Sequence, residues 1–183
     1  MFDLLITDCR VIDGSNTPWY RADVAVKDGK TAAVGKLAGR SDVSAAKVVD
    51  GHDKYLAPGF IDIHSHSDTT VMTYPRAESR VLQGVTTEIG GNCGMSSAPV
   101  SHDPQKKKEL AAYIGDMPYT WNSTGEFLDR VAESSPSVNF GTAVGHGTLR
   151  IAAMGFSDRR PDEKEMNTMK SLLRQSLSEG AFA

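Results

Sequence analysis

Two histidines and a cysteine are the residues of this sequence whose types and spacing favour metal chemistry. A single residue separates His64 from His66, and the pair follows the strand-like run 60–63. In a strand, residues i and i+2 point to the same side, so both imidazoles are expected to converge where the strand ends. Neutral imidazole is a good zinc ligand. The alternative interpretation is a pair of surface histidines at the end of a strand, because such pairs are common by chance.

The cysteine is Cys93, which lies in the glycine-rich segment 90–94 directly after the strand-like run 85–89. A free cysteine is most often a buried packing residue, but a glycine-rich loop at the end of a strand is a poor place for packing. A thiolate together with imidazoles favours zinc over magnesium or calcium. A catalytic nucleophile is the remaining alternative, although it would need a base that the sequence does not identify.

Other polar residues near these segments have roles that the sequence leaves open. His146 stands between two glycines after the expected strand 138–144, where it could line a pocket, orient a ligand or form a local structural hydrogen bond. Asp68 follows the histidine pair closely and could orient either imidazole. His52 and His102 fall in expected loops, without an evident partner.

Alternating strands and helices are expected to position these residues. A chain of this kind forms a parallel sheet, and (β/α) barrels place their chemistry at the carboxyl ends of the strands. A complete barrel needs about 250 residues, whereas residues 58–183 number 126 (183 − 57). The fold class is therefore α/β, the first half of a (β/α)8 TIM-type barrel. The patterns predict strands at 60–63, 85–89, 138–144 and from 180, and helices at 76–83, 105–114, from Ser123 and from Pro161.

Residues 1–57 differ from the rest of the chain. Short apolar runs separated by turns predict strands, and Asp28-Gly29 predicts the turn of a hairpin. The expected organisation is a small β-sandwich-like module over 1–57, followed by the partial barrel over 58–183.

The bulk composition excludes several classes of protein. The net charge of −3 gives no sign of a nucleic-acid-binding surface. Two cysteines cannot build a disulfide framework, the N-terminus lacks a basic and apolar leader, and no apolar run approaches the roughly 18 residues of a membrane span. These features favour a cytoplasmic protein, without a nucleic-acid or membrane partner.

Three segments together resemble a known family. Residues 57–68, which contain the histidine pair, resemble the first barrel strand of the amidohydrolase superfamily. Residues 90–96 resemble the cysteine-bearing loop after the second strand of D-aminoacylases, and residues 145–150 resemble a further segment of the same enzymes. The chain is therefore identified as similar to the N-terminal part of the N-acyl-D-amino-acid deacylase (D-aminoacylase) family.

The resemblance implies a function and a set of ligands. It implies a zinc-dependent hydrolase that cleaves an N-acyl-D-amino acid to a D-amino acid and a carboxylate, with His64, His66 and Cys93 as metal ligands. In the family the cysteine holds its metal together with two later histidines, so the resemblance implies that Cys93 and the histidine pair do not close one site alone. Those two histidines, and the aspartate that moves a proton, match no residue of this chain. No catalytic residue is therefore assigned, and the isolated chain is expected to be inactive.

Two alternatives remain open. The first is a non-catalytic truncated remnant that binds metal weakly or not at all. The second is a cyclic amidohydrolase of the dihydropyrimidinase or dihydroorotase type, which usually carries a carboxylated lysine on a middle strand. Cys93 and its loop argue against this second alternative.

Overall fold

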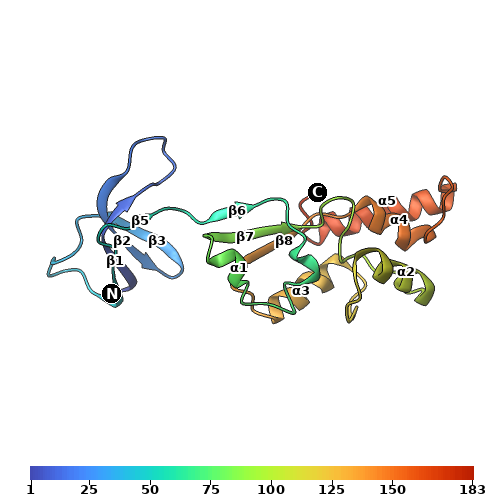
Figure 1. The fold of residues 1–183 in the computed structure, drawn as a ribbon, viewed down its shortest axis with the longest axis horizontal. Coiled ribbons are helices and arrows are strands. Elements are labelled where there is room, and N and C mark those ends of the chain that lie inside the picture. The colour runs from blue at the N-terminus through green and yellow to red at the C-terminus, as the bar shows by residue number, and fades with distance from the viewer. The chain divides into compact units, whose positions relative to one another are not determined.

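A computed structural model describes residues 1–183 as two compact units, Met1–Pro58 and Gly59–Ala183 (Figure 1). The first unit contains only strands, and the second contains a parallel sheet with helices. None of the helices combines the length and the apolar character needed to cross a bilayer.

The first unit is one five-stranded sheet with the order β3-β2-β1-β4, in which β5 also pairs with β1. The predicted hairpin is confirmed as β2 and β3, which run antiparallel. The β-sandwich-like arrangement was wrong, because the strands form a single sheet with one small apolar cluster around Cys9 and another around Leu5. Propensity indicated the strands but not that β1 would pair along both of its edges. The strands are β1 (Phe2–Val11), β2 (Tyr20–Lys27), β3 (Lys30–Gly35), β4 (Ala45–Asp50) and β5 (Tyr55–Leu56).

A bulge in β1 gives His52 the partners that the sequence did not reveal. The β1–β2 register shifts between Ile6 and Cys9, and Asp8 there has a φ of 55°. His52 Nδ1 lies 2.5 Å from Asp8 Oδ2, and its Nε2 lies 3.3 Å from Asp53 Oδ2. Arg21 also contacts the Asp8 carboxylate, with 2.6 Å between Nη1 and Oδ1.

This cluster leads to a pH-dependent expectation for the first unit. The hydrogen bond with Asp8 and the charge of Asp53 raise the pKa of His52 above its ordinary value of 6.5, and the charge of Arg21 opposes them. A raised folded-state pKa means that the contribution of His52 to stability is present below about pH 6.5 and is lost as the pH rises through the raised value. Because the group is fully exposed, we expect a small effect.

The measurement is an NMR titration of His52 combined with thermal unfolding at several pH values. His52→Gln should remove part of the pH dependence of unfolding between the two pKa values. An identical pH profile for His52→Gln and the wild type would contradict this account.

The second unit is built on a three-stranded parallel sheet with the order β6-β7-β8, as the alternation of strands and helices predicted. Five helices and one 3-10 turn connect or follow the strands. The elements are β6 (Phe60–Asp62), η1 (Ser67–Thr69), α1 (Glu78–Val81), β7 (Val85–Gly90), α2 (Pro104–Ile114), α3 (Thr124–Glu133), β8 (Asn139–Thr142), α4 (His146–Met154) and α5 (Glu163–Ser178).

The helix starts follow local capping chemistry. The predicted capping box of Ser123 and Glu126 is present at α3. At α5 the prediction that Pro161 opens the helix was wrong, because Asp162 is the N-cap and forms a second capping box with Glu165. The expected helix 76–83 is only the four residues of α1, and α4 was not predicted.

The two faces of the second unit's sheet differ. On one face Phe140 packs against Phe127 of α3, within a core of buried residues contributed by the helices and connecting loops. On the other face Ile61 and Phe182 are 64% and 72% exposed. The expected fourth strand has no assigned element, but Phe182 N donates to Thr142 O at 2.9 Å, so the chain there does lie beside β8.

Candidate metal site

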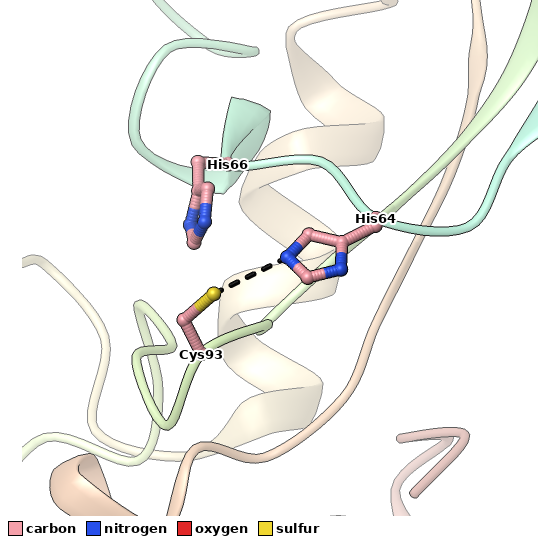
Figure 2. A group of neighbouring side chains, drawn as sticks. All are labelled: His64, His66 and Cys93. Carbon is pink, nitrogen blue, oxygen red and sulfur yellow. Dashed lines mark hydrogen bonds between the residues drawn. The ribbon is translucent and has the colours of Figure 1, made fainter.

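The three predicted ligands lie together at the carboxyl ends of β6 and β7 (Figure 2). One potential ligand atom from each of His64, His66 and Cys93 falls within 4.8 Å of the others, and all three residues are exposed. His64 Nε2 is 3.2 Å from Cys93 Sγ. The two imidazole rings are 5.8 Å apart between centroids, with an interplanar angle of 69°.

Neighbouring parallel strands bring these residues together. The carboxyl ends of β6 and β7 lie at the same edge of the sheet, and Ser65 N donates to Ile89 O at 3.0 Å, which continues the pairing beyond β6. The chain bends after β6, and in this segment Ser65 is buried while His64 and His66 are exposed.

Ser65, the buried residue between the two histidines, is held by a hydrogen bond to Glu88. Ser65 is 2% exposed, and its Oγ donates to Glu88 Oε1 at 2.8 Å. Glu88 is 1% exposed and pairs with Arg80, with 2.9 Å from Nε to Oε1. A buried carboxylate needs such partners, since losing one would leave an uncompensated charge. This chain of contacts fixes the segment that carries both imidazoles.

The loop that carries Cys93 has an unusual backbone. Cys93 has a φ of 55°, and Gly91 and Gly94 are also left-handed, at 77° and 78°. A Cβ at Gly91 would lie 2.0 Å from Ala143 O, so only glycine fits there. A left-handed residue other than glycine stores strain and persists only where its surroundings hold it. The loop is therefore held in the conformation that presents the thiol.

Asn92 ties this loop to both strands, a role that the sequence did not indicate. Its Nδ2 donates to Ile89 O at 2.8 Å and to Ser65 O at 3.3 Å. The side-chain amide thus links the end of β7 to the segment between the two histidines. Its position next to Cys93 was visible in the sequence, but no local pattern shows which distant carbonyl an asparagine will contact.

Neither of the two residues with open roles belongs to the group of three. Asp68 is 2% exposed, its Oδ2 accepts from Ser97 Oγ at 3.2 Å, and burial raises its pKa above the ordinary value of 3.8. His146 is the first residue of α4, is exposed and does not belong to the group of three. The structure therefore places the histidine of the 145–150 segment at the start of a helix rather than among the ligands.

The donor set fits zinc better than a hard cation. Two imidazoles and one thiolate are borderline and soft ligands, and oxygen-preferring ions would need carboxylates in their place. With zinc bonds of about 2.0–2.3 Å, tetrahedral ligand atoms stand roughly 3.3–3.5 Å apart. The 3.2 Å between His64 and Cys93 is close to that spacing.

Several known proteins are similar to this chain in both sequence and fold. The amidohydrolase family model matches residues 47–181. A D-aminoacylase of Alcaligenes xylosoxydans xylosoxydans is 38% identical over 99% of this chain, which spans 37% of the relative's length. A D-aminoacylase crystal structure matches all of this chain with a TM-score of 0.85 and 35% identity, over 38% of that protein.

A second solved structure is informative about metal chemistry. The N-acyl-D-glutamate deacylase of Bordetella bronchiseptica, complexed with zinc and a phosphonate mimic of the tetrahedral intermediate, has a TM-score of 0.85 and 34% identity. It is matched over 97% of this chain and 36% of its own. The family match over most of the chain and the parallel strands that gather the three ligands lead to one conclusion: this chain belongs to the amidohydrolase family, and it corresponds to the N-terminal part of D-aminoacylase-type proteins.

Proposed function

We propose that this chain is part of a zinc-dependent hydrolase that cleaves the amide bond of N-acyl-D-amino acids, and that His64, His66 and Cys93 are zinc ligands. The observation that carries the proposal is the convergence of one thiol and two imidazoles within 4.8 Å. It is supported by the similarity to D-aminoacylase and to a zinc-containing N-acyl-D-glutamate deacylase.

The chain's own residues hold and orient the metal ligands. When bound, zinc activates water and polarises an amide carbonyl. His64, His66 and Cys93 would bind it, Ser65 and Glu88 hold the histidine segment, and Asn92 holds the cysteine loop to it. The resemblance to D-aminoacylases matches no residue of this chain to the aspartate that moves a proton. We therefore assign no catalytic acid or base within residues 1–183.

Two finer points belong to the same proposal. We place the protein in the cytoplasm, because an exposed free thiol such as Cys93 keeps its ligand capacity in a reducing compartment. We place a small N-acyl-D-amino acid at the open side of the group, where all three ligands are exposed. A cyclic amidohydrolase is disfavoured, since a cysteine supplies the ligand after the second barrel strand.

The test is a hydrolysis assay on a longer protein that carries this chain and completes the barrel. We expect release of the D-amino acid from an N-acetyl-D-amino acid, little release from the L-enantiomer, and loss of activity after chelation that zinc restores. Turnover that survives chelation would contradict the zinc mechanism. Hydrolysis of cyclic amides in place of N-acyl-D-amino acids would contradict the assigned substrate.

A further inference from the structure

We propose that Thr148 is a positioning residue for the metal site, because it holds the loop that carries Cys93 against the start of α4. This inference rests on the proposed zinc site at His64, His66 and Cys93. It also gives a role to segment 145–150, whose histidine does not join the group of ligands.

The first contact joins the buried Thr148 hydroxyl to the backbone of Ser96. Thr148 is fully buried, and its Oγ1 accepts from Ser96 N and donates to Ser96 O, both at 2.9 Å. Ser96 is 1% exposed, and its Oγ accepts from Gly145 N at 2.9 Å and donates to Ala98 O. Both hydroxyls are therefore used as donor and acceptor. A fully satisfied buried network of this kind favours one geometry, since any shift leaves a polar group unpaired.

The second contact involves the residue next to Cys93. The carbonyl of Gly94 accepts from Gly147 N at 2.9 Å and from Thr148 N at 3.3 Å. These are N–H groups of the first turn of α4, which have no partner within their own helix. The loop's own carbonyl thus satisfies the helix start, so the position of α4 fixes the position of Gly94.

The glycines of the segment permit this close approach. A Cβ at Gly145 would lie 2.3 Å from Gly94 O, and a Cβ at Gly147 would lie 2.9 Å from the same atom. No side chain fits at either position without moving the loop. The two glycines of the segment therefore let α4 approach the loop closely. The hydroxyl of Thr148 then forms hydrogen bonds with the loop.

Two residues, Asn92 and Thr148, hold the loop that carries Cys93 to different parts of the second unit. Asn92 ties it to the strands, and Thr148 ties it to α4. Cys93 between them has the strained φ of 55°. Releasing the α4 side is expected to let the backbone relax and to turn the thiol away from His64, whose Nε2 is 3.2 Å from Sγ.

The experiment compares three substitutions in the full chain, using zinc affinity and the thiolate-to-metal absorption of the cobalt-loaded protein. Thr148→Val removes the hydroxyl and should weaken zinc binding about 10–100-fold, the usual effect of removing a group that orients a metal ligand. It should also reduce the thiolate absorption. Thr148→Ser keeps the hydroxyl and should restore both.

The matched control is Thr124→Val. Thr124 is equally buried, at 1% exposure, and its Oγ1 donates to Ser176 Oγ at 2.9 Å between α3 and α5, away from the loop. This substitution should lower stability without changing the cobalt spectrum. If Thr148→Val does not fold, Ser96→Ala, which removes the acceptor for Gly145 N, carries the same expectation.

The outcomes distinguish a failure of the positioning role of Thr148 from a failure of the proposed metal site. Normal zinc affinity and a normal cobalt spectrum in folded Thr148→Val would overturn the positioning role while leaving the metal site intact. Equal losses in Thr124→Val would also overturn it, since they would show general destabilisation. A wild-type chain that binds neither zinc nor cobalt would overturn the proposed metal site itself.

Discussion

Cys93→Ala is expected to abolish tight zinc binding. The thiol is one of only three donors in the group, and it is the one that selects for zinc over oxygen-preferring cations. We expect a loss of affinity greater than the about 10–100-fold caused by removing a group that merely orients a ligand. Metal analysis after dialysis against a weak chelator measures the effect.

Cys9→Ala is the matched control for this experiment. Cys9 is 1% exposed and its Sγ contacts Ala22 O at 3.0 Å, so its removal should lower stability without changing the zinc content. Unchanged zinc in Cys93→Ala would contradict the ligand assignment and would leave this cysteine with a role in the loop alone.

Residues 1–183 alone are expected not to hydrolyse N-acyl-D-amino acids, whereas a longer protein that completes the barrel is expected to do so. The three proposed ligands are exposed, so water has free access to them, and no residue of this chain matches the family's proton-moving aspartate. Solvent also screens the metal's field and competes with a substrate. The sheet face with Ile61 and Phe182 is also exposed. The interior of a complete barrel is filled by packed side chains, so this exposed face agrees with an incomplete barrel.

The assay measures both proteins with the same zinc concentration and the same N-acetyl-D-amino acid. A zinc-affinity measurement on the short chain accompanies it, so that inactivity is not confused with absence of metal. Turnover by residues 1–183 at a rate near that of the longer protein would show that the proton acceptor lies within this chain.

Much of the site was predictable because its determinants are local. That His64, His66 and Cys93 would lie close together followed from their positions after two neighbouring strands, because the carboxyl ends of parallel strands meet at one edge. Their role as metal ligands came from the resemblance to D-aminoacylases and not from the spacing. The capping box at Ser123 was equally local. The structure brings together the three residues that these rules selected.

The remaining features depend on contacts between distant residues or on competing local signals. The glycines at 145 and 147 were interpreted as the end of a strand, so α4 was not predicted. Its later residues, Leu149 to Met154, are mostly strong helix formers. His52 gained its partner through a bulge at Asp8, 44 residues away. The carbonyls that Asn92 contacts were not predictable either, since side-chain propensity does not encode which backbone groups lie near a loop.

His64, His66 and Cys93 are proposed to be zinc ligands, and X-ray absorption at the zinc edge of the zinc-loaded chain tests this most directly. We expect sulfur at about 2.3 Å and imidazole nitrogens at about 2.0–2.1 Å. Cys93→Ala should lose the sulfur contribution and His102→Gln should keep it. A zinc environment made only of nitrogen and oxygen in the wild-type chain would contradict the account.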